Sequence, residues 1–228
     1  MPLVLRREEN MTLEEFKKRY ESDPEWAPGW EAIDMVFERL YPGQNPVHFA
    51  AVSRARLGGD EYLDGCSIFD SPKGYKHIVT YGMSELYYNE KSFGGEWSRW
   101  GYEMTIKLAE ADNQNCTWAL DMLNNLARYT FTQKQFFEPE QYVAGDGTSL
   151  CIGRESAITA LAIACDTEAE GVDTVYGRLD FVQLVGITQR EFEAIKGQRD
   201  NVRLLFERMR EDGNPDLVTD LNRVKSYL

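Results

Sequence analysis

The segment GYEMTIKL, residues 101–108, constrains the fold of this chain more than any other stretch. Large apolar residues alternate along it with Glu103, Thr105 and Lys107. A period of two residues is that of a β-strand with one face toward the core and one face toward solvent. The pattern therefore predicts a half-buried strand of an antiparallel or mixed sheet.

Other segments predict the rest of a mixed α/β chain. Strands are expected at residues 47–55, 66–71, 75–82, 156–164 and 178–188, because each is rich in apolar and β-branched residues. Helices are expected at residues 11–20, 29–42, 116–137, 189–197 and 201–212, where apolar residues recur at helical spacing. In the longest of these helices the predicted apolar face is Trp118, Met122, Leu126 and Tyr129. Residues 213–223 are expected to form a turn followed by a short strand or tail.

The order of these elements predicts a single α+β domain with a central mixed β-sheet flanked by helices. We expect this domain to span residues 28–228 and a helical extension to precede it at residues 1–27. The acidic segment DTEAEGVD, residues 166–173, is expected to be a solvated loop.

The net charge of −13 limits the partners of the chain. An acidic protein repels phosphate backbones, so we expect no nucleic-acid binding. The same field attracts a basic protein, although acidity also serves solubility alone. No apolar run reaches the roughly 18 residues of a membrane span, so no membrane partner is expected.

Cysteine and histidine usage predicts no cofactor and no metal site. The four cysteines form no CxxC pair, and the chain has two histidines. The first ten residues lack the apolar core of a signal peptide. We therefore expect reduced, mostly buried thiols in a cytoplasmic protein.

The segment YGMSELYYNE, residues 81–90, offers the strongest hint of a site. Ser84 and His77 could be imagined as nucleophile and base, but the GxSxG elbow is absent, so no catalytic residue is predicted. Seven aromatic residues crowd positions 81–102, and tyrosine and tryptophan are enriched at binding hot spots. Core packing and partner contact both remain open for these rings. The predicted partner-binding residues are Glu85, Tyr87, Tyr88, Glu90, Trp97 and Trp100.

Several blocks resemble the Suppressor of fused (SUFU-like) domain family in family order. They are LYPGQNPVHFAAVSRARLGGDEYLDGCSIF, HIVTYGMSELYYNE, RWGYEMTIKL, LNNLARYTF, GRLDFVQLVGITQREFEAIK and PDLVTDLNR. The resemblance implies a Suppressor of fused N-terminal-domain-like fold and a binding role without catalysis. The animal member of the family regulates Hedgehog signalling by binding Gli-type transcription factors, with two domains closing on an extended peptide. This chain resembles the first of those domains and the short bacterial members, some of which are immunity proteins of toxin systems.

The chain departs from the family pattern beside the aromatic cluster. Trp97 and Trp100 flank Arg99, and Tyr88 stands where glycine is usual. We therefore expect a non-catalytic domain that neutralises or regulates a partner protein, with a basic toxin domain as one candidate. An enzyme of unknown substrate and a scaffold module without an inhibitory role are the alternatives.

Overall fold

The computed structural model describes residues 11–55 and 58–228, which form a mixed sheet with helices on both faces. The strands are β1 (Val47–Ala50), β2 (Gly65–Asp70), β3 (Lys76–Tyr81), β4 (Trp97–Leu108), β5 (Tyr142–Val143), β6 (Ile158–Cys165), β7 (Val172–Thr174) and β8 (Gly177–Thr188). The α-helices are α1 (Leu13–Ser22), α2 (Pro28–Leu40), α3 (Thr117–Gln133), α4 (Gln189–Ile195) and α5 (Arg199–Glu211). Short 3-10 turns, η3 (Glu90–Ser92) and η4 (Asn113–Cys116), complete the list.

The sheet has the strand order β1-β2-β3-β4-β8-β6-β5, and β7 pairs with β8 beside this path. Its first four strands run antiparallel, β4 and β8 run parallel, and β6 runs antiparallel to β8. The sheet is therefore mixed, as the sequence predicts. The parallel pair is its centre, and its 12-residue strands are the longest of those described.

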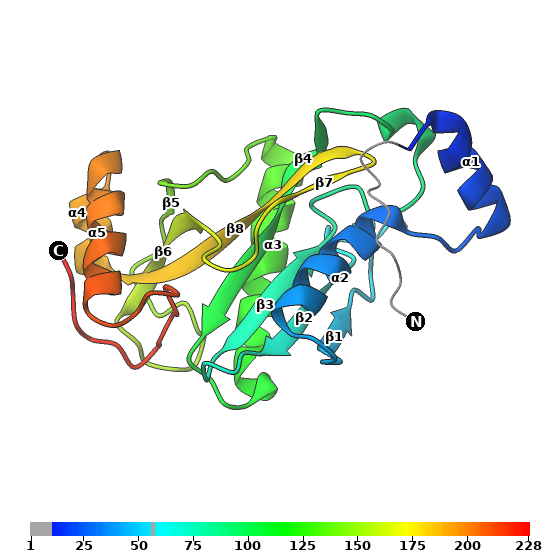
Figure 1. Cartoon of the computed structure of the whole chain (residues 1–228). Helices are drawn as coiled ribbons and strands as arrows, with labels where there is room; N and C mark the ends of the chain where they lie inside the picture. Colours follow the sequence, from blue (N-terminus) through cyan, green and yellow to red (C-terminus); the bar gives the residue numbers. More distant parts are fainter. Residues whose placement is uncertain (1–10, 56–57) are drawn as a thin grey trace.

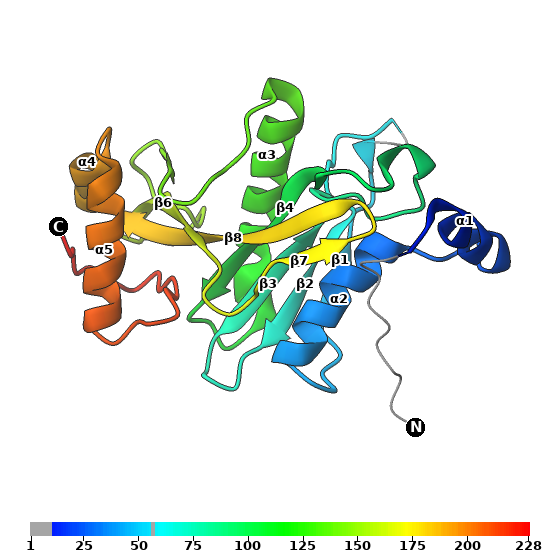
Figure 2. The same cartoon turned by 45° about the horizontal axis from the view of Figure 1, so that its top comes forward.

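Helices cover both faces of the sheet (Figure 1). α3 packs on one face, with Leu123 and Ala127 against apolar residues of β2, β3, β4 and β8. α2 packs on the other face, with Ile33 and Phe37 against Phe181 and its neighbours. α4 and α5 close the end of the sheet formed by β6 and β8, and α1 lies at the opposite end of the molecule (Figure 2).

The apolar face of α3 differs from the predicted one. Trp118, Met122 and Leu126 are half-buried, and Tyr129 is exposed. The fully buried stripe consists of Ala119, Leu123, Ala127 and Thr130. Small residues on this stripe let the helix approach the sheet closely, so the large side chains flank the contact rather than fill it.

The prediction that residues 101–108 form a half-buried strand is wrong. Glu103, Thr105 and Lys107 are as fully buried as the apolar residues with which they alternate. β4 lies between β3 and β8, and both of its faces are covered. Glu103, Thr105 and Lys107 can be buried because their polar partners lie in other segments of the chain. The alternating pattern of residues 101–108 does not reveal those partners.

Three other segments depart from expectation. The strand expected at residues 47–55 is limited to β1 because the chain turns away after Ala50. The acidic segment contributes Val172 and Asp173 to the short strand β7. In the last segment, Thr219 forms a single parallel bridge to Leu108, so the chain after α5 adds no full strand over the described residues.

Candidate protein-interaction surface

The loop that follows β3 is built on one buried acid, Glu103. Its carboxylate accepts hydrogen bonds from the backbone N–H groups of Gly82 and Ser84 at 3.0 and 2.9 Å. The hydroxyls of Thr80 and Ser84 each donate to it at 2.6 Å. Burial raises the pKa of Glu103, and these hydrogen bonds oppose the shift. Glu103 of β4 therefore fixes the start of the loop, at the point where β3 ends.

These contacts give Ser84 a structural role. Its hydroxyl donates to Glu103, and it is fully buried. His77 is occupied elsewhere, with Nδ1 at 2.7 Å from the Tyr41 hydroxyl and Nε2 at 2.9 Å from Asp166 Oδ2. Serine and histidine therefore do not form a nucleophile–base pair, in agreement with the absence of a GxSxG elbow.

The six predicted partner-binding residues fall into three groups. Glu85 and Tyr87 support the loop from within: Glu85 accepts a hydrogen bond from Asn89 Nδ2 at 2.9 Å, and the Tyr87 hydroxyl donates to Asp64 at 3.2 Å. The other four residues lie at two separate surfaces.

Tyr88 and Glu90 face α1, which covers this part of the loop. The Tyr88 ring stacks on Tyr20 with ring centroids 3.9 Å apart, and Glu90 pairs with Lys17 at 2.5 Å. Trp97 and Trp100 lie away from α1 and line a groove instead. The structure thus separates residues that are neighbours in the sequence into a covered surface and an open one.

The groove has a volume of about 1010 Å³ and an aromatic rim with acidic residues beside it. Trp97 and Phe136 are 51% and 52% exposed and line the same groove, and apolar side chains that share a groove can mark an interaction site. Glu138, Glu170 and Asp180 line the groove together with Arg99 and Arg178, and Arg178 pairs with Asp180 at 2.7 Å, so Glu138 and Glu170 are the acids left facing a partner. A surface of this composition suits an apolar side chain flanked by basic residues on a partner protein.

An irregularity in β4 creates the rim of the groove. The register between β4 and β8 shifts between Trp97 and Tyr102, and Gly101 has a φ of +80°. A Cβ at Gly101 would lie 2.8 Å from the Trp97 ring, so a side chain there would displace that ring. Arg99, with a φ of +56°, donates to the Gly82 carbonyl at 3.0 Å. The bulge therefore presents the two tryptophans and ties the groove to the loop after β3.

The acidic segment lines the groove and also reaches into the core, so the expectation of a solvated loop is wrong. The side chain of Asp166 is fully buried, with Lys107 Nζ at 3.1 Å and His77 Nε2 at 2.9 Å. Lys107 is also 3.3 Å from Glu168. Burial alone would raise the pKa of Asp166, but His77 and Lys107 outweigh burial and hold that pKa well below its usual range.

Sequence reasoning missed this buried charge cluster of His77, Lys107, Asp166 and Glu168. The signal was present in Lys107, because a lysine within an otherwise apolar strand needs an acidic partner if both faces of the strand are covered. Ala169, Glu170 and Gly171, which follow the cluster, line the groove. The cluster thus positions one wall of the candidate surface.

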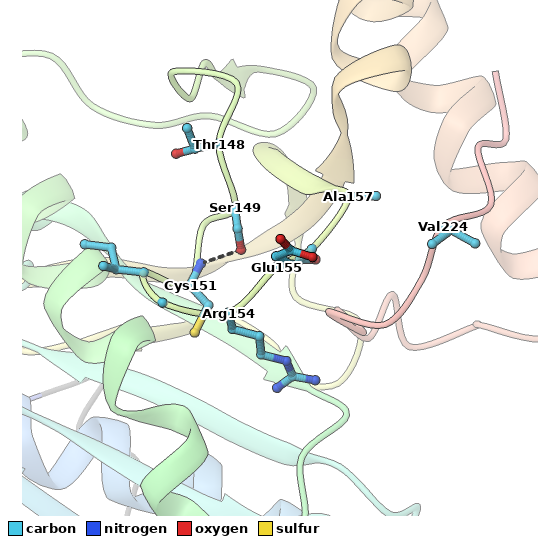
Figure 3. Close-up of a pocket in the computed structure, with 10 residues that line it drawn as sticks. Thr148, Ser149, Cys151, Arg154, Glu155, Ala157 and Val224 are labelled. Carbon is cyan, nitrogen blue, oxygen red and sulfur yellow. Dashed lines mark hydrogen bonds between the residues drawn. The ribbon is translucent and has the colours of Figure 1, made fainter.

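A second, more open hollow of about 830 Å³ lies between the loop at residues 148–157 and the C-terminal segment (Figure 3). Ser149 accepts a hydrogen bond from the Cys151 backbone N–H at 3.2 Å, and Val224 lies across from Ala157. Arg154 in its wall pairs with Glu110 at 2.5 Å. None of the six predicted residues lines this hollow.

The described residues also bear on metals, thiols and membranes. Over residues 11–55 and 58–228, no three His, Cys, Asp or Glu side chains gather as metal ligands would. All four cysteines are free, with Cys66 and Cys116 buried, Cys151 half-buried and Cys165 exposed. None of the helices in these residues has the length and apolar character that crossing a membrane requires.

Comparison with known proteins identifies relatives of this chain. The sequence model of the Suppressor of fused protein (SUFU) family matches residues 59–224. The Suppressor of fused homologs of Homo sapiens and Mus musculus are each 30% identical over 212 residues, covering 86% of this chain and 43% of the relative. The chain therefore spans less than half the length of these curated relatives.

Solved structures agree with the fold. A chain in the crystal structure of the Sufu–Fu complex matches with a TM-score of 0.76 at 26% identity, covering 88% of this chain and 92% of that chain. Drosophila Suppressor of Fused gives the same TM-score and identity over 51% of its length. A SUFU homolog from Neisseria gonorrhoeae, 16% identical with a TM-score of 0.60 over 97% of its chain, shares the fold. Sequence and fold together establish that this chain belongs to the Suppressor of fused family.

Proposed function

We propose that this chain is a non-catalytic protein-binding domain that regulates or neutralises one partner protein by forming a stoichiometric complex. The observation that carries the proposal is the groove lined by Trp97, Trp100 and Phe136, where the half-exposed rings of Trp97 and Phe136 are typical of a binding hot spot. A relative with the same fold was crystallised in a Sufu–Fu complex, which supports a protein as the ligand.

The charge of the chain narrows the chemistry of the partner. The net charge is −13, and Glu138 and Glu170 lie among the residues lining the groove, beside the Arg178–Asp180 ion pair. Opposite fields speed association and weaken as salt screens them, so the partner is basic and its capture depends on salt. A basic toxin domain neutralised in the cytoplasm by an immunity protein fits these properties, and it is the specific role we propose.

Affinity capture with matched variants tests this function. The tagged chain, a Trp97→Ala/Phe136→Ala variant and an Ile152→Ala control are incubated with lysate of the source cells at low and high salt. Ile152 is 96% exposed and lines the other hollow, so its variant removes an exposed apolar side chain away from the groove. Trp97 and Phe136 are half-exposed and Ile152 is almost fully exposed, so both variants are expected to fold normally.

The expected result is one basic protein that the wild type and the control retain one to one, that high salt releases, and that the groove variant fails to retain. Retention of the same protein by all three chains would remove the groove from the proposal. A wild-type chain that retains no protein at either salt concentration would contradict the function itself.

A further inference from the structure

α1 covers an aromatic surface at the end of the molecule opposite α4 and α5 (Figures 1 and 2). This surface, here called the α1 site, consists of Tyr88, Phe93, Val175 and Tyr176 together with Trp26. It combines the loop after β3 with the turn between β7 and β8. It is separate from the groove and includes the position where tyrosine replaces the usual family glycine.

The contacts of α1 have the pattern of a helix bound in a groove. Phe16 is fully buried, and its ring lies 4.7 Å from Tyr88 and 4.8 Å from Phe93, centroid to centroid. Tyr20, one helical turn later, also stacks on Tyr88, with ring centroids 3.9 Å apart. Anchors at positions i and i+4 are those by which an amphipathic helix binds a partner.

Charges flank these aromatic anchors. Lys17, between the two aromatic positions, pairs with Glu90 of the loop at 2.5 Å. Arg19 pairs with Glu31 of α2 at 3.0 Å and lies over the Trp26 ring at 4.2 Å. α1 therefore docks through two aromatic residues one turn apart with basic residues beside them.

The floor of the site is held by contacts that do not involve α1. The Tyr176 hydroxyl donates to the Tyr87 carbonyl at 2.6 Å and accepts from the Asn89 backbone N–H at 3.1 Å. Asn89 Nδ2 in turn donates to Glu85 at 2.9 Å. These bonds hold Tyr176 and the backbone of the loop in place without α1, whereas the rings of Tyr88 and Phe93 make their ring contacts with α1.

α1 itself buries few of its side chains. It has ten residues, and Phe16 is its one fully enclosed side chain among those described. Helices shorter than about 12 residues are marginal in water, so α1 is helical mainly because it is docked. An element with so little buried surface detaches at a lower free energy than the sheet unfolds.

From these contacts we propose that the α1 site is a helix-binding site, occupied in cis by α1, that an amphipathic helix of a partner protein can take over. The partner helix carries aromatic residues at i and i+4 and a basic residue at i+1, as α1 does. This site lies beyond the groove of the proposed function, and its test does not depend on that function.

The test uses a fluorescent peptide of residues 11–22 added in trans to the full-length chain. A Phe16→Asp variant releases the resident helix, because a carboxylate cannot remain in the apolar site. We expect the peptide to bind this variant at least tenfold more tightly than the wild type. Adding Tyr88→Ala to the variant, or moving the second aromatic residue of the peptide from i+4 to i+2, abolishes binding.

Equal binding of the peptide to wild type and variant, or no binding to either, would overturn the proposal.

Hydrogen exchange of the wild-type chain gives a second test, which does not require any variant to fold. Amides of α1 are expected to exchange at least a hundredfold faster than those of β4. Equally slow exchange in α1 and β4 would make α1 a permanent part of the core and rule out its displacement.

Discussion

Glu103 and Asp166 are both fully buried acids on the central sheet, yet their surroundings differ in kind. Glu103 receives hydrogen bonds from neutral hydroxyl and backbone groups, and burial raises its pKa. Asp166 has a lysine and a histidine within 3.1 Å, and its pKa is lowered despite burial. The fold therefore fixes the loop after β3 by neutral hydrogen bonds and the acidic segment by charge pairing.

This difference matters because the two acids support two different surfaces, the loop covered by α1 and the wall of the groove. Glu103 holds the start of the loop that carries Tyr87, Tyr88 and Glu90. Asp166 holds the segment whose later residues line the groove. Substitutions that remove the contacts of Glu103 and of Asp166 separately show how much each acid contributes to the unfolding free energy and to partner binding.

The largest effect is expected for Lys107→Met. The substitution keeps a similar volume but leaves Asp166 and Glu168 without their buried lysine. Breaking a buried ion pair by removing one partner costs about 3 to 5 kcal/mol of unfolding free energy. Denaturant unfolding measures this loss, and a loss below about 1 kcal/mol would show that the cluster does not anchor the acidic segment.

A smaller effect is expected for Glu103→Gln. The amide keeps the shape of the acid, but its NH₂ group must face donors in either orientation, those at Gly82 and Ser84 or the Thr80 hydroxyl. Leaving buried donors without an acceptor costs about 1 to 3 kcal/mol. Urea unfolding of this variant beside Lys107→Met ranks the two supports. A larger loss of unfolding free energy in Glu103→Gln than in Lys107→Met would show that the neutral hydrogen bonds, and not the charge pairs, contribute more to stability.

The two acids are expected to respond to pH in opposite directions. The pKa of Asp166 is lowered, so its contribution is complete above its ordinary value of 3.8 and is lost as the pH falls. The pKa of Glu103 is raised in the folded chain, so the unfolded chain releases this proton at a lower pH, near 4.5. The contribution of Glu103 to the unfolding free energy is therefore complete below pH 4.5 and falls as the pH rises.

Unfolding free energies of the wild type, Asp166→Asn and Glu103→Gln across the acid and neutral range test these signs. The advantage of the wild type over Asp166→Asn should shrink on acidification below about pH 4. Its advantage over Glu103→Gln should shrink as the pH rises above about 5. Parallel curves for the two variants would mean that the two acids do not differ in the way proposed.

The smallest effect on global stability is expected for Tyr88→Ala combined with Glu90→Lys. Both residues contact α1, and Glu90→Lys brings two lysines together at position 17 and position 90. Because α1 adds little to the sheet, we expect the unfolding free energy to change by no more than about 1 kcal/mol, together with weaker capture of a partner that binds at the α1 site. Partner affinity equal to that of the wild type would exclude these two residues from binding.

The sequence predicted the sheet, its mixed character and the buried strands near residues 156–164 and 178–188, because those signals are local. It predicted neither β5 nor β7, which have two and three residues and no pattern of their own. It misjudged Lys107 because the countercharge, Asp166, lies about 60 residues further along the chain. It also could not show that Tyr88 is stacked by α1, since that contact depends on tertiary packing.

Titration of the purified partner into the wild type and the Trp97→Ala/Phe136→Ala variant is the most direct test that the groove binds a basic protein. We expect one partner per wild-type chain, an affinity that falls as salt rises, and a loss of at least tenfold in the groove variant at either salt concentration. Equal affinity of the two chains for the partner, with no dependence on salt, would contradict binding through an acidic aromatic groove.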